Sequence, residues 1–456
     1  MKRFIRQNAT RIPQTGDFRL SLLIAAIGFA VTLWAFYPGY MSQDSAAQYL
    51  QARTGNFDTQ HPPLMAMIWR LTDRVIPGPG GIFVLFALMV WSGLAMLASH
   101  ATTQRWMTVT AIPAIGWWPP MIGLVAHVWK DVGLLAAFLL ASGLLARESR
   151  RPSRVLLAMA FGAIAMGAAF RHNGLFAAIP FMPYLAVRWS RSGTTRRRIV
   201  AVVALATLFT IAVAELPTYL PHVERRSMWP TVALWDLAAV SIDENRILIP
   251  DSLLRPGLTV ADLSSNFSPF TNTSTFRTDR IRLSLREPYD AMQNRDLLRA
   301  WVALPFRHPS AYWRHRWRLT RLLFGSSLQG RPSYLVLQPE YQQLADNPPV
   351  SPNRSTLNWL VIHALLVLIA TPLFSGWLYV SVALLVLLGC VVQTTSENRA
   401  LAATIAASGL CYAVPLSVLS GAADFRYLSW LVGASLVAML LVVEGVLISR
   451  NTRPNA

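Results

Sequence analysis

The sequence predicts an all-α protein that crosses a membrane many times. Of its 456 residues, 54% are hydrophobic and only 14% are charged, and the mean hydropathy is +0.39. Soluble globular proteins carry about 25% charged residues. The charged residues also lie between long apolar runs instead of being spread evenly along the chain, and insertion into a bilayer requires this arrangement.

The apolar runs predict about 11 transmembrane helices, within a range of about 10 to 12. A helix needs about 20 apolar residues to cross the hydrocarbon core, and several of these runs are shorter. The basic N-terminus precedes a first run without a small-residue cleavage site, so we expect an uncleaved first span. The runs cover residues 20–38, 81–99, 106–126, 131–147, 154–170, 174–188, 199–216, 357–373, 375–393, 400–420 and 427–448.

Basic residues in the short loops predict the orientation, since lysine and arginine are enriched in cytoplasmic loops. The N-terminal tail and the loops at 147–154 and 188–198 are basic, which places them inside. The first seven spans then alternate without conflict, and the segment 39–80 lies outside. Four further spans would leave the C-terminus outside, although its arginines favour the inside, so the orientation of the last four spans stays open.

The same pattern divides the chain into three predicted parts. Residues 1–216 form a transmembrane module of seven spans, whose first outer loop, 39–80, is expected to contain juxtamembrane helices. Residues 217–356 are polar and rich in Pro, Asn and Ser, which predicts a small, partly helical domain on the outer face. Residues 357–456 contain the C-terminal transmembrane helices.

The net charge of +19 does not indicate a nucleic-acid-binding protein. Many of the basic residues lie in short loops between apolar segments, where they retain loops on the cytoplasmic side. The two cysteines, Cys390 and Cys411, lie in apolar segments and form neither a redox nor a metal-binding motif.

The first outer loop contains three titratable residues that are candidates for a functional site. Ser42 is a good N-cap for a short helix that has Asp44 in its first turn. Asp58 and His61 follow, and two prolines then begin the next helix. Asp44 has two interpretations: a favourable partner for the helix dipole, or a general base. The two further titratable groups in the same loop favour the functional one.

Two further constellations lie at predicted outer ends of spans. Lys130 and Asp131 begin the fourth span, where they are either an interfacial anchor or a functional pair, since charges in a bilayer are costly. Arg171, His172 and Asn173 form an outer turn. A cation there opposes the positive-inside bias, and binding an anion would explain it.

Arg426, in the tetrapeptide DFRY before the last span, is a candidate for an outer ion pair. Carboxylates and cations are thus predicted to meet on one side of the membrane. Such side chains can catalyse the transfer of a chemical group from a phosphate leaving group to a hydroxyl. A carboxylate would act as the base, and the cations would bind the phosphate.

These stretches resemble a known family. YMSQDSAAQYL followed by HPPLMAMIW is similar to the first luminal loop of GT-C-fold glycosyltransferases, which include protein mannosyltransferases and bacterial enzymes that add aminoarabinose to lipid A. WKDVGLL matches the acidic residue that begins their fourth span. The stretches HPPL, WKD, FRHNG, WDLAAVS, HPSAYWRHR and DFRY resemble poorly characterised bacterial members more closely.

The resemblance implies an inverting glycosyltransferase of the bacterial inner membrane, with its site facing the periplasm. Its partners would be a polyprenyl-phosphate sugar donor, a lipid or glycan acceptor and membrane lipids. By this analogy Asp44 is the base. This chain has Ser45 where family members often have a second acid, which leaves a divalent cation and the acceptor class open, and no other cofactor is indicated.

By the same analogy Lys130 and Arg171 would bind the donor phosphate and His61 would contact the donor or the acceptor. The other residues of these constellations are further candidates because of where they lie. Asp58 and Asp131 are candidates for a second acid or an acceptor contact. The candidates for binding the donor phosphate or the substrate are His61, Lys130, Arg171, His172, Asn173 and Arg426.

Three other function classes fit a protein of this kind. A transporter or flippase for lipid-linked glycans would place ionisable residues near the bilayer midplane, whereas the charges here lie at the ends of spans. A ligase or polymerase of surface glycans also uses an outer site, but concentrates basic residues in a late loop. A non-catalytic assembly protein is the third alternative.

Overall fold

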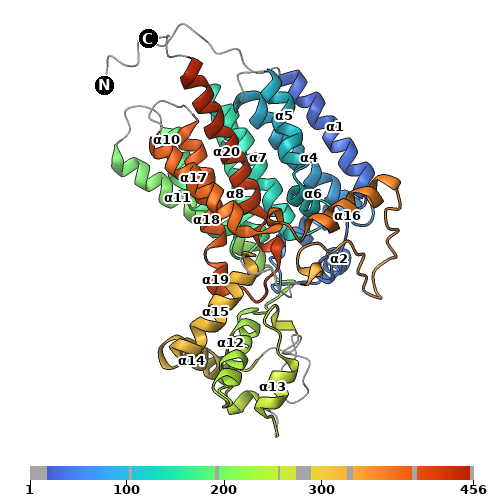
Figure 1. Cartoon of the computed structure of the whole chain (residues 1–456), viewed down its shortest axis with the longest axis vertical. Coiled ribbons are helices and arrows are strands. Elements are labelled where there is room, and N and C mark those ends of the chain that lie inside the picture. Colours follow the sequence, from blue (N-terminus) through green and yellow to red (C-terminus); the bar gives the residue numbers. More distant parts are fainter. Residues whose placement is uncertain are drawn as a thin grey trace.

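The chain folds as a bundle of long helices with a smaller group of helices at one end (Figure 1). The computed structural model describes residues 18–101, 105–190, 195–254, 257–273, 289–325, 332–392 and 398–451. The basic N-terminal tail and Arg453, which contributed to the predicted orientation, lie outside these residues. The bundle consists of α1 (Phe18–Phe36), α4 (Gly80–Ala101), α5 (Arg105–Gly116), α6 (Pro119–Val125), α7 (Lys130–Arg150), α8 (Arg154–Phe170), α9 (Gly174–Ala178), α10 (Phe181–Ser190), α11 (Arg196–Glu215), α17 (Gly376–Val392), α18 (Arg399–Ala413) and α20 (Ser429–Asn451).

The predicted class, an all-α membrane protein, is confirmed. Within the described residues, six helices are long and apolar enough to cross a membrane, and α5 with α6 would add a seventh. These two helices meet at an angle of 58°. Two consecutive prolines at the start of α6 lack the N–H groups that would continue α5. Every predicted span falls on one or two helices, but the count of eleven is not confirmed.

Shorter elements complete the described chain. The connecting helices are α2 (Gln43–Thr54), α3 (Leu64–Asp73), α16 (Thr356–Leu368) and α19 (Leu416–Leu419), and the 3₁₀ helices are η1 (Leu216–Tyr219), η2 (Asp251–Leu253), η4 (Ser333–Leu335), η5 (Pro372–Phe374) and η6 (Phe425–Leu428). The strands β1 (Phe57–Asp58) and β2 (Val223–Glu224) pair in parallel. Through this pairing, the first outer loop contacts the chain that follows α11.

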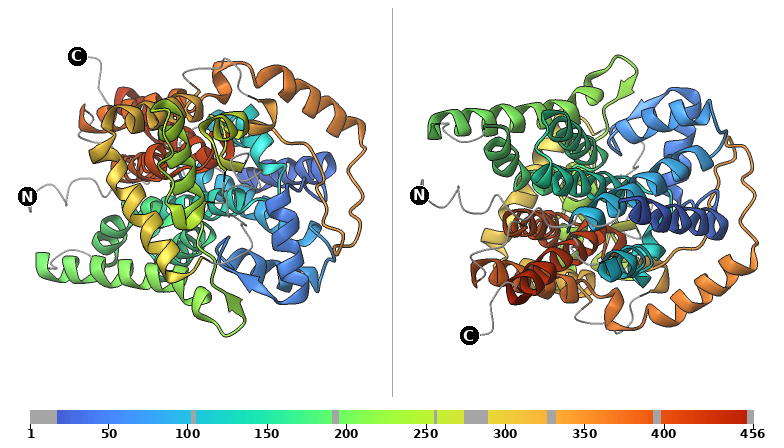
Figure 2. Two further views of the ribbon diagram at one scale, coloured as in Figure 1. Left: turned by 90° about the horizontal axis from the view of Figure 1, so that it is seen from below. Right: turned by 90° about the horizontal axis from the view of Figure 1, so that it is seen from above.

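The orientation of the C-terminal helices follows from α16, which begins and ends on one side of the bundle. Near its start, Asn358 donates a hydrogen bond of 2.8 Å to the carbonyl of Ala35, at the outer end of α1. After its end, the backbone N–H of Trp377 donates to the carbonyl of Phe324, which ends a helix of the outer group, at 3.0 Å. In Figures 1 and 2, α16 lies at the edge of the bundle and runs transverse to the long helices.

A helix of 13 residues is about 20 Å long, shorter than the hydrocarbon core of about 30 Å. The predicted span at 357–373 is therefore better described as an interfacial helix. Only α17, α18 and α20 then remain to cross after the outer segment. They return the chain to the side on which α1 begins, where Arg147 of α7 contacts the ring of Phe18 and Arg150 lies 3.9 Å from Glu444 of α20. The side of the membrane on which this end lies stays a prediction.

Helix α7 lies at the centre of the bundle and packs closely against α4. A Cβ atom on Gly143 would lie 2.4 Å from the carbonyl oxygen of Gly93, and one on Gly93 would lie 2.6 Å from the carbonyl oxygen of Leu139. Only glycine allows the two backbones this approach, a common feature of helix pairs in membranes. The tight packing fixes the outer end of α7, where Lys130 and Asp131 lie.

The outer helices form a group with a hydrophobic core of its own. They are α12 (Trp229–Asp243), α13 (Val260–Asn266), α14 (Ala291–Arg307) and α15 (Pro309–Leu323). Leu234, Leu237, Leu253, Leu297 and Leu304 are buried between them. We call this group the outer domain. The boundaries predicted for it, 217 and 356, stay a prediction.

Candidate active site at the outer end of the bundle

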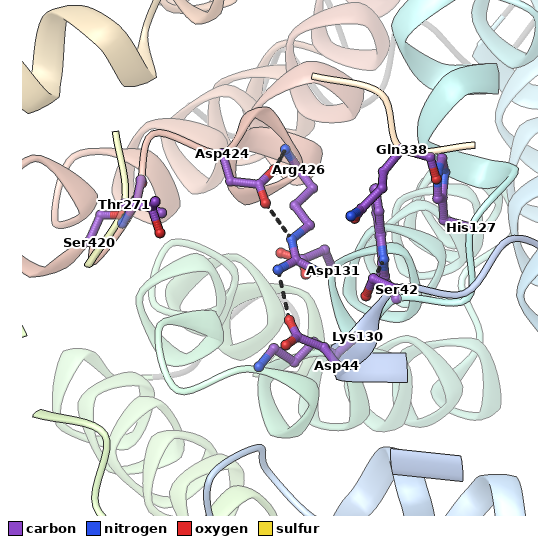
Figure 3. A network of polar contacts seen from close by, with 12 residues as sticks. Ser42, Asp44, His127, Lys130, Asp131, Thr271, Gln338, Ser420, Asp424 and Arg426 are labelled. Carbon is purple, nitrogen blue, oxygen red and sulfur yellow. Dashed lines mark hydrogen bonds and ion pairs between the residues drawn. The ribbon is translucent and has the colours of Figure 1, made fainter. Parts of the chain in front are cut away.

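Four polar residues from distant parts of the chain meet at the outer end of the bundle. Figure 3 shows three of them, Asp44, Lys130 and Arg426. Asp44 lies in the first turn of α2, His61 in the loop before α3, Lys130 at the start of α7 and Arg426 in η6. All four were candidates from the sequence, and the fold brings them within contact distance of one another.

The N-terminus of α2 is attached to the segment that precedes α7. The backbones of Tyr40 and Val128 are joined by a hydrogen bond of 2.9 Å. Ser45 donates to the carbonyl of Val128 at 2.7 Å, and the indole of Trp129 donates to the Ser42 hydroxyl at 3.0 Å. These bonds explain why Asp44 lies beside Lys130, although 85 positions separate them in the chain.

Arg426 lies between two carboxylates. Its terminal nitrogen donates to Oδ2 of Asp44 at 2.7 Å, and its Nε lies 2.8 Å from Oδ2 of Asp424 (Figure 3). The guanidinium also lies 5.1 Å from the ring centre of Trp129 and 5.5 Å from that of Tyr427, as in a cation–π contact. The outer ion pair predicted for the DFRY segment therefore has a second acid, which the local sequence alone could not identify.

The carboxylate of Asp44 is ionised and partly exposed, so a ligand can contact it. Burial by itself would raise the pKa of Asp44, but the surrounding positive groups, Arg426 foremost, together outweigh this effect and hold the pKa well below its usual range. The side chain of Asp44 keeps 35% of its surface exposed, whereas the side chain of Arg426 keeps only 11%. The carboxylate is therefore surrounded by protein on most sides and open on one.

His61 and Lys130 form the second part of the site. Nζ of Lys130 donates a hydrogen bond to Nδ1 of His61. Burial, followed by the charge of Lys130, lowers the pKa of His61 to about 3, so this ring is neutral near pH 7. Since Nδ1 accepts from Lys130, the proton of the neutral ring lies on Nε2. That atom faces Oδ1 of Asp44 at 3.8 Å.

Asp131 and Arg171 are buried together as an ion pair, with no exposed surface on the Asp131 side chain and 12% on that of Arg171. The ring of Tyr427 covers the guanidinium at 4.5 Å. A buried carboxylate requires a partner of opposite charge, and Arg171 supplies it. The predicted roles of Asp131 as a second acid and of Arg171 as a ligand of the donor phosphate stay predictions.

Asp58 lies in the same loop as His61 but has other partners. Its Oδ1 accepts from the backbone N–H of Gln60 at 3.0 Å, and its Oδ2 lies 4.0 Å from Arg226 at the start of the outer domain. These contacts attach Asp58 to the turn that carries His61. The predicted roles of Asp58, as a second acid or an acceptor contact, stay predictions.

His172 and Asn173 lie at the edge of the site. The amide of Asn173 donates to the carbonyl of Tyr412 at 3.5 Å and so connects α9 with α18. His172 lines a small cavity of about 10 Å³, together with Pro62, Arg171 and Glu215. Neither His172 nor Asn173 forms a hydrogen bond or ion pair with Asp44, and their predicted roles in substrate binding stay predictions. Within the described ranges, no three His, Cys, Asp or Glu side chains are grouped to hold a metal ion.

Comparisons with known proteins add little to this geometry. No family model and no curated protein matches the chain. The crystal structure of ArnT from Cupriavidus metallidurans in the apo state aligns with 94% of this chain and 77% of that chain. The two are 15% identical in sequence, with a TM-score of 0.31. Agreement at this level carries no functional argument, so the function has to be inferred from the site.

Proposed function

We propose that this protein is a membrane glycosyltransferase that moves a sugar from a polyprenyl-phosphate donor to a hydroxyl group of a lipid or glycan. The observation that carries the proposal is the contact between Asp44 and Arg426 at 2.7 Å, beside Lys130 and on the open side of the site. An ionised carboxylate that a ligand can reach, next to two basic side chains, suits a reaction in which a base takes the proton of an acceptor hydroxyl and a phosphate is the leaving group.

Arg426 and Lys130 are the proposed ligands of the donor phosphate. A guanidinium binds phosphate oxygens in a planar, two-pronged geometry. Among the described residues, Lys130 has no carboxylate within ion-pair distance, and its side chain donates a hydrogen bond to the neutral His61. A phosphate that enters beside Asp44 would supply the negative charge that keeps Lys130 protonated.

Binding of the donor would also activate Asp44. A carboxylate with a very low pKa is a weak base, because little driving force favours proton transfer to it. A phosphate that takes hydrogen bonds from Arg426 weakens the ion pair that keeps the pKa of Asp44 low. The pKa of Asp44 then rises when the donor is in place, and the acceptor hydroxyl can transfer its proton to the carboxylate.

The chemical step balances with these groups. The acceptor oxygen attacks the anomeric carbon from the side opposite the phosphate, and a new carbon–oxygen bond forms. The bond from the anomeric carbon to the phosphate oxygen breaks, and its electron pair leaves with polyprenyl phosphate. The acceptor proton passes to Asp44, and the configuration at the anomeric carbon is inverted. Arg426 and Lys130 stabilise the charge that develops on the leaving phosphate.

The buried acids of the bundle favour this proposal over a transporter. Glu148, near the end of α7, pairs with Arg188 at 2.7 Å, and Glu444 lies near the end of α20. Asp131 is the second residue of α7. Transporters place such groups at the bilayer midplane, in broken helices. In the described helices, these acids lie near the ends instead.

The test supplies purified protein in lipid nanodiscs with a panel of polyprenyl-phosphate sugars and a membrane lipid extract as the source of acceptor hydroxyl groups, and it measures release of polyprenyl phosphate. We expect one donor to be consumed by the wild type and by Asp251→Asn, but not by Asp44→Asn. The Asp251 variant is the matched control, since it changes the same residue type at an exposed position of the outer domain. Consumption of no donor, or equal consumption by both variants, would contradict the proposal. The bacterial inner membrane, with the site facing the periplasm, is the proposed location.

A further inference from the structure

A buried polar cluster lies in the outer domain, away from the site. Asp236 has no exposed surface and Arg316 has 1%. Oδ2 of Asp236 accepts from Arg316 at 2.5 Å and from the indole of Trp301 at 2.7 Å, and Nε2 of His315 lies 3.1 Å from Oδ1. Burying polar groups is costly unless each has a partner for hydrogen bonding or ion pairing, so these contacts determine how the side chains of the cluster are placed.

Arg316 connects this cluster to the segment before η6. Its other terminal nitrogen donates to the carbonyl of Ser420 at 2.8 Å. The guanidinium has donors in a rigid fork, so it bonds to the carboxylate and to the carbonyl at the same time. Ser420 lies only six positions before Arg426, whose guanidinium contacts Asp44.

Backbone bonds attach the same segment to the outer domain. The N–H of Asn272 donates to the carbonyl of Gly421 at 2.9 Å, and the N–H of Ala423 donates to the carbonyl of Phe270 at 2.8 Å. Figure 3 shows Thr271 beside Ser420. We call residues 420–424 the η6 loop. It joins α19 to η6, and the bonds from the outer domain determine where it lies.

The outer domain also contacts the half of the site that carries His61. The hydroxyl of Thr59 donates to the carbonyl of Arg226 at 2.9 Å and accepts from the N–H of the same residue at 2.8 Å. Thr59 is two positions before His61. One domain therefore contacts both the loop with His61 and the loop that leads to Arg426.

We propose that Arg316, oriented by Asp236, is a positioning residue that holds the η6 loop, so that the outer domain sets the position of Arg426 at the site. The inference deepens the proposed function and rests on it. Neither Arg316 nor Asp236 touches the reacting groups. A displacement of about 1 Å in a group that binds substrate can lower a rate about 100-fold, so a positioning contact has a measurable effect.

The test uses Arg316→Lys, which keeps the charge next to Asp236 but lacks the fork that reaches Ser420. Removing the charge could unfold the domain, because Asp236 would be buried without a partner. The matched control is Arg314→Lys on the same helix. Arg314 is 67% exposed and pairs with Asp243 at 2.6 Å, away from the η6 loop.

A disulfide supplies an independent rescue. Thr271 and Ala422 face each other as an antiparallel pair, and the Cα separation of such pairs falls in the range that a disulfide spans. The variant T271C/A422C is made in the Arg316→Lys background, with Cys390 and Cys411 replaced by Ala, and its disulfide should join the η6 loop to the outer domain without Arg316. Comparing the oxidised and reduced forms tests whether attachment of the loop restores the binding that Arg316→Lys loses.

Two readouts separate this inference from the proposed function. Hydrogen exchange of the amides from 421 to 428 reports on the loop, and binding of a short-chain polyprenyl phosphate reports on the site. We expect Arg316→Lys to exchange faster and to bind about tenfold more weakly, since about one hydrogen bond is lost. The oxidised disulfide should restore both, and Arg314→Lys should change neither.

Wild-type exchange and affinity in Arg316→Lys would overturn the inference, and so would a loss of affinity that the oxidised disulfide does not restore. If the loop responds as expected but the wild type itself binds no polyprenyl phosphate, the role of Arg316 in holding the loop stands and the proposed function is overturned.

Discussion

Asp44 and Arg426 are 382 positions apart in the chain, and their side chains form an ion pair of 2.7 Å. One residue lies in the first outer loop, the other directly before the last helix of the bundle. The pair therefore connects the N-terminal and C-terminal parts of the bundle at its outer end. It also places a carboxylate and a cation side by side in a site that a ligand can reach.

Asp44→Asn is expected to nearly abolish turnover. General-base catalysis contributes about 10²–10⁴-fold in rate, and an amide cannot accept the acceptor proton. The change is almost isosteric, so folding and donor binding should survive. Turnover, thermal unfolding and donor affinity are measured on the same preparation, with Asp251→Asn in the outer domain as the control. A well-folded Asp44→Asn protein that retains activity would remove Asp44 from the mechanism.

Arg426→Gln and Lys130→Gln are expected to weaken donor binding as well as turnover. Each would remove a cation that meets the phosphate both in the ground state and in the transition state. Charge-assisted hydrogen bonds are worth about 1.5–3 kcal/mol, so the affinity should fall about 10- to 100-fold for each change. Titration with a polyprenyl-phosphate donor measures this. Unchanged affinity in both variants would show that the phosphate binds elsewhere.

The pair of Asp131 and Arg171 is expected to stabilise the fold. Removing one partner leaves a buried charge, which costs about 3–5 kcal/mol of unfolding free energy. Asp131→Asn and Arg171→Gln should therefore each lower the unfolding temperature strongly, and the double variant should be less destabilised than their sum. A stable Arg171→Gln protein with weakened donor binding would instead support the phosphate-binding role that the sequence suggested.

The neutral state of His61 predicts how stability depends on pH. Burial and Lys130 lower its pKa from 6.5 to about 3, so between these values the unfolded chain binds a proton that the native protein does not. The resulting stability is fully present above about pH 6.5 and is lost as the pH falls toward about 3. The unfolding temperature should fall between pH 7 and pH 5. His61→Gln should fall less steeply, and an equal slope would mean that His61 is protonated in the native state.

The two ends of α16 are expected to be labelled from the same side of the membrane. Single cysteines at Ser355 and Thr371, in a chain with Cys390 and Cys411 replaced, should both react with an impermeant thiol reagent in intact cells. A cysteine at Ser149, at the opposite end of the bundle, should react only after the cells are opened. Labelling of only one end of α16 from outside would show that this helix crosses the membrane.

Much of the membrane class and of the site was evident from the sequence. Hydropathy is a local property, so runs of apolar residues indicate helices that can be buried in lipid whatever they pack against. Asp44 and His61 were identifiable as titratable groups that share the first outer loop. Lys130 and Arg426 were identifiable because charged groups at the ends of apolar runs are costly and need a reason to be there.

Only the tertiary structure decided how these groups are paired. The sequence did not show that Asp131 and Arg171 form a buried ion pair with each other, because this contact depends on the packing of α7 against α8. The hydropathy of 357–373 could not distinguish a crossing helix from one lying at the interface, because both bury apolar side chains. The contacts of Asn358 and Trp377 did so. Partners hundreds of positions apart meet through the packing of whole helices, which local patterns in a sequence do not specify.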